Sequence, residues 1–87
     1  MSKKHTILGI HITDRVERAG EVQTVLGAYG CHIRTRLGLH DVGEKSCSSN
    51  GLILIEVVGS EADSRAITAA LRAVKGVQVQ KMVFAHP

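Results

Sequence analysis

The sequence predicts an α+β protein whose elements follow the order βαββαβ, a four-stranded antiparallel sheet with two helices on one face. Two segments repeat their apolar residues at helical spacing, and four segments are rich in β-branched and apolar residues. The chain also divides into two halves of similar strand–helix–strand plan. Aromatic residues make up only 2% of the 87 residues, so Ile, Leu, Val and Ala must build the core, which favours a sheet covered by helices.

The first half begins with a predicted strand at about 5–12, whose TILGIHI run is β-branched and apolar. A helix is predicted over 14–29, since Asp14 is a suitable N-cap and Glu17 follows three residues later. Its apolar stripe consists of Val16, Ala19, Val22, Leu26 and Tyr29. Gly30 is expected to end the helix in a left-handed conformation.

The second strand, predicted at 31–40, alternates between two faces. One face holds Cys31, Ile33, Thr35, Leu37 and Leu39, and the opposite face holds His32, Arg34, Arg36 and His40. The following segment, 41–51, is polar and rich in Ser and Gly, which predicts a long flexible loop.

The second half repeats the plan with strands at 52–59 and 77–85 and a helix at 61–75. Ser60 is a candidate N-cap, and Gly76 is placed to end this helix. Acidic side chains suit the positive end of the helix dipole at Glu61 and Asp63, and the apolar stripe is Ile67, Ala70, Leu71 and Val74. The order is the ferredoxin-like pattern, with the first and third strands central in the sheet.

The chain is short enough for one domain, 1–87, and its helices can protect only one face of the sheet. The other face would expose Ile7, Gly9, Leu52, Leu54 and Val58. An exposed apolar patch usually marks a contact surface. We therefore expect a homo-oligomer that assembles through the sheet faces or edges; the alternative is a monomer whose long loop folds over the sheet.

Cationic side chains form the clearest candidate site. His32, Arg34, Arg36 and His40 would form one strip, since side chains two apart on a strand point the same way. Arginine offers a planar fork of donors that suits a carboxylate or phosphate. Pairing of the second and third strands would place Arg36 near Glu56, so an ion pair buried between protomers is an equally weighted alternative to ligand binding.

Other chemistries are less well supported by the sequence. Cys31, Cys47 and five histidines suggest a metal or thiol-redox sensor as an alternative function, but their spacing matches no compact zinc pattern, and a small buried cysteine is the commoner role for Cys31. No metal or other cofactor is predicted. Direct nucleic-acid binding is not expected, because the first and third strands lack the aromatics on which bases stack.

Catalytic and membrane functions are not expected either. The sequence has no nucleophile elbow, P-loop or HExxH motif, so we do not expect an enzyme. It has no apolar run long enough to cross a membrane and no recognisable secretory signal, which predicts a cytoplasmic protein without a membrane partner.

Short motifs distributed from about residue 6 to 84 resemble those of a known family. They are Asp14-Arg15 in the first turn, Tyr29-Gly30, Arg36-Leu37-Gly38, and Asn50-Gly51 through Val58-Gly59. The chain resembles ACT-type regulatory domains and, more closely, the small ACT-like iron-only hydrogenase system regulators, which are related in fold to the C-terminal domain of the nickel-responsive repressor. Segment 52–58 has no His, so nickel binding is not carried over.

The resemblance implies a stand-alone ACT-like regulatory module that forms a homo-oligomer and senses a small anionic or amino-acid-like effector. The candidate ligand-binding residues are Asp14, Arg15, Arg34, Arg36 and His40. ACT domains that bind amino acids usually have a Gly soon after the Asp, whereas the nearest one here is Gly20, well inside the predicted helix.

Overall fold

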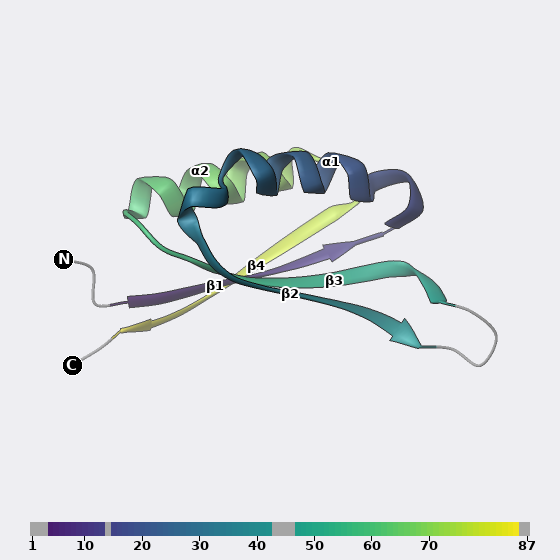
Figure 1. The fold of residues 1–87 in the computed structure, drawn as a ribbon, viewed down its shortest axis with the longest axis horizontal. Helices are drawn as coiled ribbons and strands as arrows, with labels where there is room; N and C mark the ends of the chain where they lie inside the picture. Colours follow the sequence, from purple (N-terminus) through teal and green to yellow (C-terminus); the bar gives the residue numbers. More distant parts are fainter. Residues whose placement is uncertain (1–3, 14, 43–46, 86–87) are drawn as a thin grey trace.

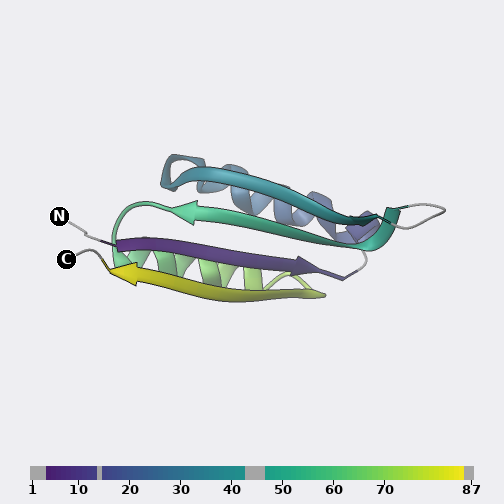
Figure 2. The same ribbon diagram turned by 90° about the horizontal axis from the view of Figure 1, so that it is seen from below.

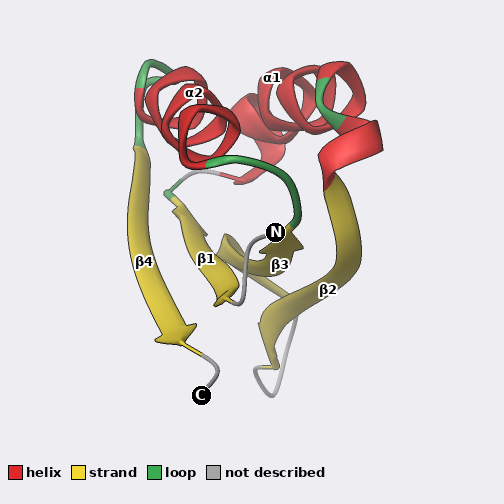
Figure 3. Cartoon of the chain, turned by 90° about the vertical axis from the view of Figure 1, so that its left-hand side faces the viewer, coloured by secondary structure: helices red, strands yellow, loops and turns green. Residues whose placement is uncertain are grey.

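The computed structural model describes residues 4–13, 15–42 and 47–85, which form one sheet and one layer of helices (Figure 1). The elements in chain order are β1 (Lys4–Ile12), α1 (Arg15–Ala28), a short 3₁₀ turn (Gly30–His32), β2 (Ile33–Val42), β3 (Cys47–Val57), α2 (Glu61–Arg72) and β4 (Val77–Ala85). Both helices lie on the same side of the sheet (Figures 1 and 3). No helix in the described ranges has the length and apolar character needed to span a bilayer.

The four strands are antiparallel and lie in the order β2-β3-β1-β4, as Figure 2 shows from the side opposite the helices. The two central strands are β1 and β3, as the sequence predicts. This topology confirms the ferredoxin-like βαββαβ fold.

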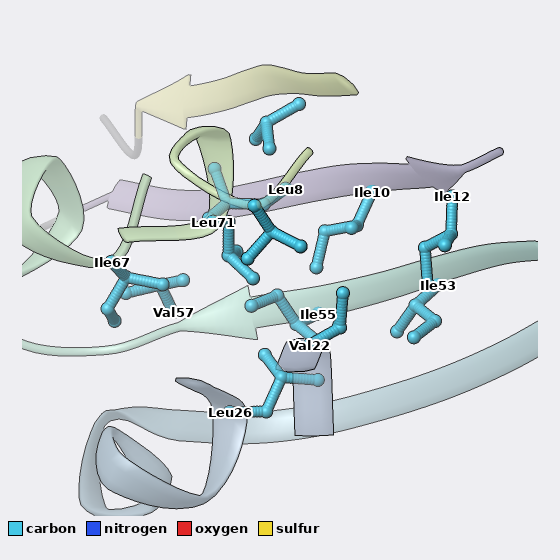
Figure 4. Close-up of a cluster of buried hydrophobic side chains, with 12 residues drawn as sticks. Leu8, Ile10, Ile12, Val22, Leu26, Ile53, Ile55, Val57, Ile67 and Leu71 are labelled. Atoms are coloured by element: carbon cyan, nitrogen blue, oxygen red, sulfur yellow. The ribbon is translucent and has the colours of Figure 1, made fainter. Parts of the chain in front are cut away.

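The core lies between the sheet and the helices (Figure 4). From β1 it receives the alternating residues Leu8, Ile10 and Ile12, which are at most 2% exposed. The other buried hydrophobic residues are Val22, Leu26, Ile53, Ile55, Val57, Ile67, Leu71, Val74 and Val79. From the two predicted helical stripes, this core contains Val22, Leu26, Ile67, Leu71 and Val74, and Tyr29 packs against it.

The start of α2 agrees with the sequence, whereas its end and the end of α1 differ. Ser60 accepts a hydrogen bond from the Asp63 N–H, and Asp63 accepts one from the Ser60 N–H, which completes a capping box. α2 ends at Arg72, before the predicted end at residue 75, and Gly76 (φ 81°) lies in the turn that leads to β4 instead of ending the helix. The prediction that Gly30 ends α1 in a left-handed conformation is wrong. Gly30 is the first residue of the 3₁₀ turn, in which the His32 N–H donates a hydrogen bond to the Tyr29 carbonyl at 2.9 Å.

The predicted loop over 41–51 is also wrong for most of its length. β2 continues to Val42 and β3 begins at Cys47, so the two strands form a long hairpin at the end of the molecule away from the termini (Figure 1). The pairing continues through His40 opposite Gly51 and Val42 opposite Cys47. Backbone hydrogen bonds between antiparallel strands form regardless of the side chains. The polar composition of 41–51 is therefore compatible with strands.

Candidate functional site

One face of the sheet is covered by no described element, and we call it the open face (Figure 2). Leu8 and its alternating neighbours face the helices, so Ile7 and Gly9 face the other way. Large apolar side chains from three strands are exposed there, namely Leu37 (51%), Leu52 (36%), Met82 (51%) and Phe84 (51%). The open face therefore carries exposed apolar side chains on β2, β3 and β4.

A β-bulge in β2 changes where the arginines lie. Ile33 pairs with Val57, yet Thr35 pairs with Glu56, so two residues of β2 advance the ladder by only one residue of β3. The alternation of faces is reset at Arg34. A residue expected on one face from sequence spacing therefore lies on the other after the bulge.

Arg36 consequently lies on the helix side of the sheet. It pairs with Ile55, whose side chain is buried in the core, and its guanidinium donates a hydrogen bond to Gln23 of α1. Arg34 lies on the open face instead. The single cationic strip predicted from the sequence is therefore wrong, because the bulge separates its two arginines.

A small ionic cluster at the open face, the Glu56 cluster, consists of His5, Arg34 and Glu56. His5 Nδ1 lies 2.8 Å from Glu56 Oε2, and Arg34 Nη1 lies 3.6 Å from the same oxygen. The sequence predicts Arg36 as the ion-pair partner of Glu56. Because of the bulge, Arg34 is the arginine that contacts Glu56. The side chain of Arg34 remains 61% exposed, so its guanidinium keeps donors for a second anion.

The Glu56 cluster holds the carboxylate in its charged form. The hydrogen bond from His5 is the main cause of a lowered pKa for Glu56; desolvation opposes it, and the charge of Arg34 adds a smaller lowering effect. Glu56 is thus an acceptor at neutral pH rather than a proton donor. The ionised carboxylate suits ion pairing with His5 and Arg34.

A second polar cluster lies at the start of α2. Asp63 Oδ2 accepts hydrogen bonds from the Ser60 N–H and the Ser60 hydroxyl, both at 2.9 Å, while His32 Nε2 is 3.8 Å from Asp63 Oδ1. The Ser60 N–H is the main cause of a lowered pKa for Asp63, and His32 adds a smaller effect. These contacts cap the helix and tie it to the turn before β2.

Acidification is expected to destabilise the fold through both carboxylates. A group whose pKa is lower in the folded state stabilises the fold above its unfolded pKa, and this stabilisation is lost as pH falls through the folded value. The free energy of unfolding should therefore decrease between roughly pH 5 and pH 2. Chemical denaturation across this range measures how steeply the free energy of unfolding changes with pH. The parent protein is compared with a double variant that carries Glu56→Gln and Asp63→Asn.

In the double variant the slope should be clearly shallower than in the parent protein. An unchanged slope would mean that neither the Glu56 cluster nor the capping box favours the ionised carboxylates.

The remaining predicted site residues are only partly placed. Arg15 is the first residue of α1, and His40 stands opposite Gly51 in the ladder, but their side chains, like all of Asp14, lie outside the described part of the chain. Of the five candidate ligand residues, the structure places the side chains of Arg34 and Arg36, on opposite faces of the sheet.

The cysteine residues give no support to a preformed metal site. Cys31 is a free, exposed thiol in the 3₁₀ turn, contrary to the expected buried position. Cys47 lies at the start of β3, and its side chain is outside the described residues. Within the described residues, no three His, Cys, Asp or Glu side chains come together as a group that could hold a metal ion.

His5 was missed as a candidate. Its signal was indirect: Glu56 is the one charged residue in the LILIEVV run, so a partner was to be expected on the neighbouring strands. β1 is a direct neighbour of β3, with Ile7 opposite Glu56. His5, two residues before Ile7, lies on the same face of β1 and is within reach of the carboxylate.

No protein-family model matches this sequence, and no curated protein matches it. Solved structures do share its fold. The uncharacterized protein TM1266 from Thermotoga maritima matches with a TM-score of 0.78 and 23% identity, over 93% of this chain and 98% of that protein.

Two further structures with the same fold have stated ligands or activities. CPII, a nitrogen regulatory PII-like protein from Thiomonas intermedia K12 bound to ADP, AMP and bicarbonate, has a TM-score of 0.58 and 15% identity, covering 97% and 96% of the two chains. SnoaB, a cofactor-independent oxygenase from Streptomyces nogalater, has a TM-score of 0.58 and 12% identity, covering 99% and 95%. At such identities the comparison establishes the ferredoxin-like fold.

Proposed function

We propose that this chain is an ACT-like regulatory module that assembles with copies of itself through the open face and binds a small anionic or amino-acid-like effector beside it. The observation that carries the proposal is the exposure of Leu37, Leu52, Met82 and Phe84 on the uncovered face of the sheet. The module acts by binding and assembly, without catalysis.

A second copy of the chain is the occupant that suits the open face. Two sheets that pack face to face each bury an apolar layer, and a two-fold axis makes one patch complementary to itself. The charges at this face are already paired, since Glu56 contacts both His5 and Arg34. An apolar centre with a neutralised ionic cluster beside it is the usual anatomy of a protein interface.

Arg34 is the effector contact that the geometry favours. Its side chain is well exposed while Glu56 contacts the guanidinium on one side, so the group is oriented yet still has donors for a carboxylate or phosphate. CPII, which shares the fold, was solved with two nucleotides and bicarbonate, all of them anions. These ligand classes, together with amino acids, form a rational first set for screening.

Self-association is tested by placing a charge on the open face. Leu37→Lys is expected to lower the molar mass measured by light scattering after size exclusion, because a buried lysine would lack a partner. Ala66→Lys adds the same charge at an exposed position of α2, and its measured molar mass should equal that of the parent protein. Equal masses for both variants and the parent would contradict assembly through the open face.

Effector binding is tested on the same proteins by thermal shift. A ligand that binds only the folded state contributes about 2.7 kcal/mol at a hundredfold excess over its Kd, a shift of several degrees for a domain of this size. Nucleotides, bicarbonate, amino acids and metal ions are compared. A shift with an anion that disappears in Arg34→Gln supports the proposal; no shift with any ligand points to a purely structural role.

A further inference from the structure

The two edges of the sheet differ in how well they are protected against pairing with another chain. The β2 edge is interrupted by irregular register between Ile33 and Thr35 and again between His40 and Val42, and it carries Arg34 and Arg36. Bulges and charged side chains are the usual protection of an edge strand. The β4 edge carries one charged residue, Lys81, but neither bulge nor proline: its ladder with β1 is regular over all nine residues of the strand.

The C-terminal half of β4 exposes apolar side chains on both of its faces. Met82 and Phe84 are each 51% exposed on the open face, and Val83 is 46% exposed on the helix side. Val79, which shares the face of Val83, is only 6% exposed. The helical layer thus covers the beginning of β4 and not its end, where the strand runs away from the helices (Figure 3).

Arg72 contacts the outer edge of β4 at Val79, and the unpaired part of this edge follows Val79. Its guanidinium donates a hydrogen bond to the Val79 carbonyl at 2.9 Å, so this carbonyl points away from β1. Backbone N–H and C=O groups of residues two apart on a strand point to the same side. The N–H and C=O groups of Lys81 and Val83 therefore point outward, as those of Val79 do. Among the described residues β1 is the one strand that pairs with β4, so this outer row has no strand opposite it.

We propose that the outer edge of β4, from Lys81 to Ala85, pairs antiparallel with the same segment of a second copy about a two-fold axis at Val83. The two sheets then form one continuous sheet of twice the width. This interface is distinct from the open face of the proposed function, since it uses backbone groups at the edge rather than side chains on the face.

The register follows from the chemistry of the strand. With Val83 opposite Val83 of the second copy, Lys81 lies opposite Ala85, and no two like charges meet. Met82 then lies opposite Phe84 on the open face, where a sulfur–aromatic contact is favourable. A shift by one position that places Met82 opposite itself would pair Val79 with Ala85, and the Val79 carbonyl is already bonded to Arg72.

A disulfide across the two-fold axis tests this register. Val83→Cys is prepared in a Cys31→Ser, Cys47→Ser background and oxidised mildly. Residues in a hydrogen-bonded antiparallel pair have Cα atoms about 5.5 Å apart, within the range a disulfide spans. We expect most of the folded protein to become a covalent dimer on a non-reducing gel.

Lys81→Cys in the same background is the matched control. In the proposed register the two copies of residue 81 are separated by about 13 Å or more, too far for a disulfide. Lys81→Cys alone should stay monomeric on the gel, whereas an equal mixture of Lys81→Cys and Ala85→Cys should give dimers. Folded Val83→Cys that stays monomeric, or Lys81→Cys that links to itself as readily, overturns the proposal.

A second pair of variants tests the backbone contact itself. Val83→Pro removes an N–H that points outward and leaves the ladder to β1 intact, whereas Val83→Thr keeps the N–H and the β-branched shape. The proline variant should have a lower molar mass than the threonine variant, with equal circular dichroism. Leu37→Lys should leave the Val83→Cys dimer in place, so failure of the open-face interface and failure of the edge interface are distinguishable.

Discussion

Leu8→Ala is expected to cost about 2 to 5 kcal/mol of folding free energy, which is a large fraction of the stability of a domain of this size. Leu8 is fully buried on the central strand β1, between Ile55 of β3 and Lys81 of β4 in the ladder. The helices and the sheet meet over this position (Figure 4). Removing three carbons there leaves a cavity that two flanking strands and two helices can close only in part. Urea denaturation at low protein concentration measures the loss.

Leu37→Ala is the control for the same chemical change. Leu37 is 51% exposed on the open face, so the truncation should change the stability of the isolated chain by less than about 0.5 kcal/mol. Low concentration matters because assembly through the open face would stabilise the parent by mass action. A similar loss in both variants would mean that the packing around Leu8 is not the core of the fold.

The burial of Leu8 could be predicted from the sequence, whereas the open-face position of Leu37 could not, because Leu37 follows the bulge in β2. Alternation along β1 and β3 and the two helical stripes predicted which side chains face the helices, and the burial of Leu8, Ile55 and Leu71 follows that pattern. The topology also followed from pattern, because the two strands that are apolar on both faces had to be central. Hydrophobic burial decides these features, and the spacing of apolar residues along each element reveals it.

The arginines show where that reasoning fails. Face assignment by counting assumes a regular strand, and one extra residue near Arg34 reverses it for everything that follows. The bulge itself has no residue signature in IRTRLG, since neither Gly nor Pro lies at the irregular position. The candidate site was therefore predicted in its residue types and not in its geometry.

Gly59→Ala is expected to destabilise the protein by about 2 kcal/mol or more, although it adds a single methyl group at an exposed turn. Gly59 has a φ of 120°, which L-residues other than glycine rarely adopt. An added Cβ would also lie 2.7 Å from Asp63 Oδ2 and 3.1 Å from His32 Nδ1. The oxygen it meets is the one that accepts both hydrogen bonds from Ser60, so relief of the clash disrupts the cap of α2.

Gly20→Ala is the matched control, and the opposite sign is expected. Gly20 is exposed within α1, and a Cβ there meets nothing within 4 Å. Alanine in place of glycine inside a helix stabilises by roughly 0.5 to 1 kcal/mol. Thermal unfolding of the two variants therefore separates them in direction as well as size. If Gly59→Ala melted at or above the parent temperature, the turn after β3 would have to accept a conformation other than the one that places Asp63 against Ser60.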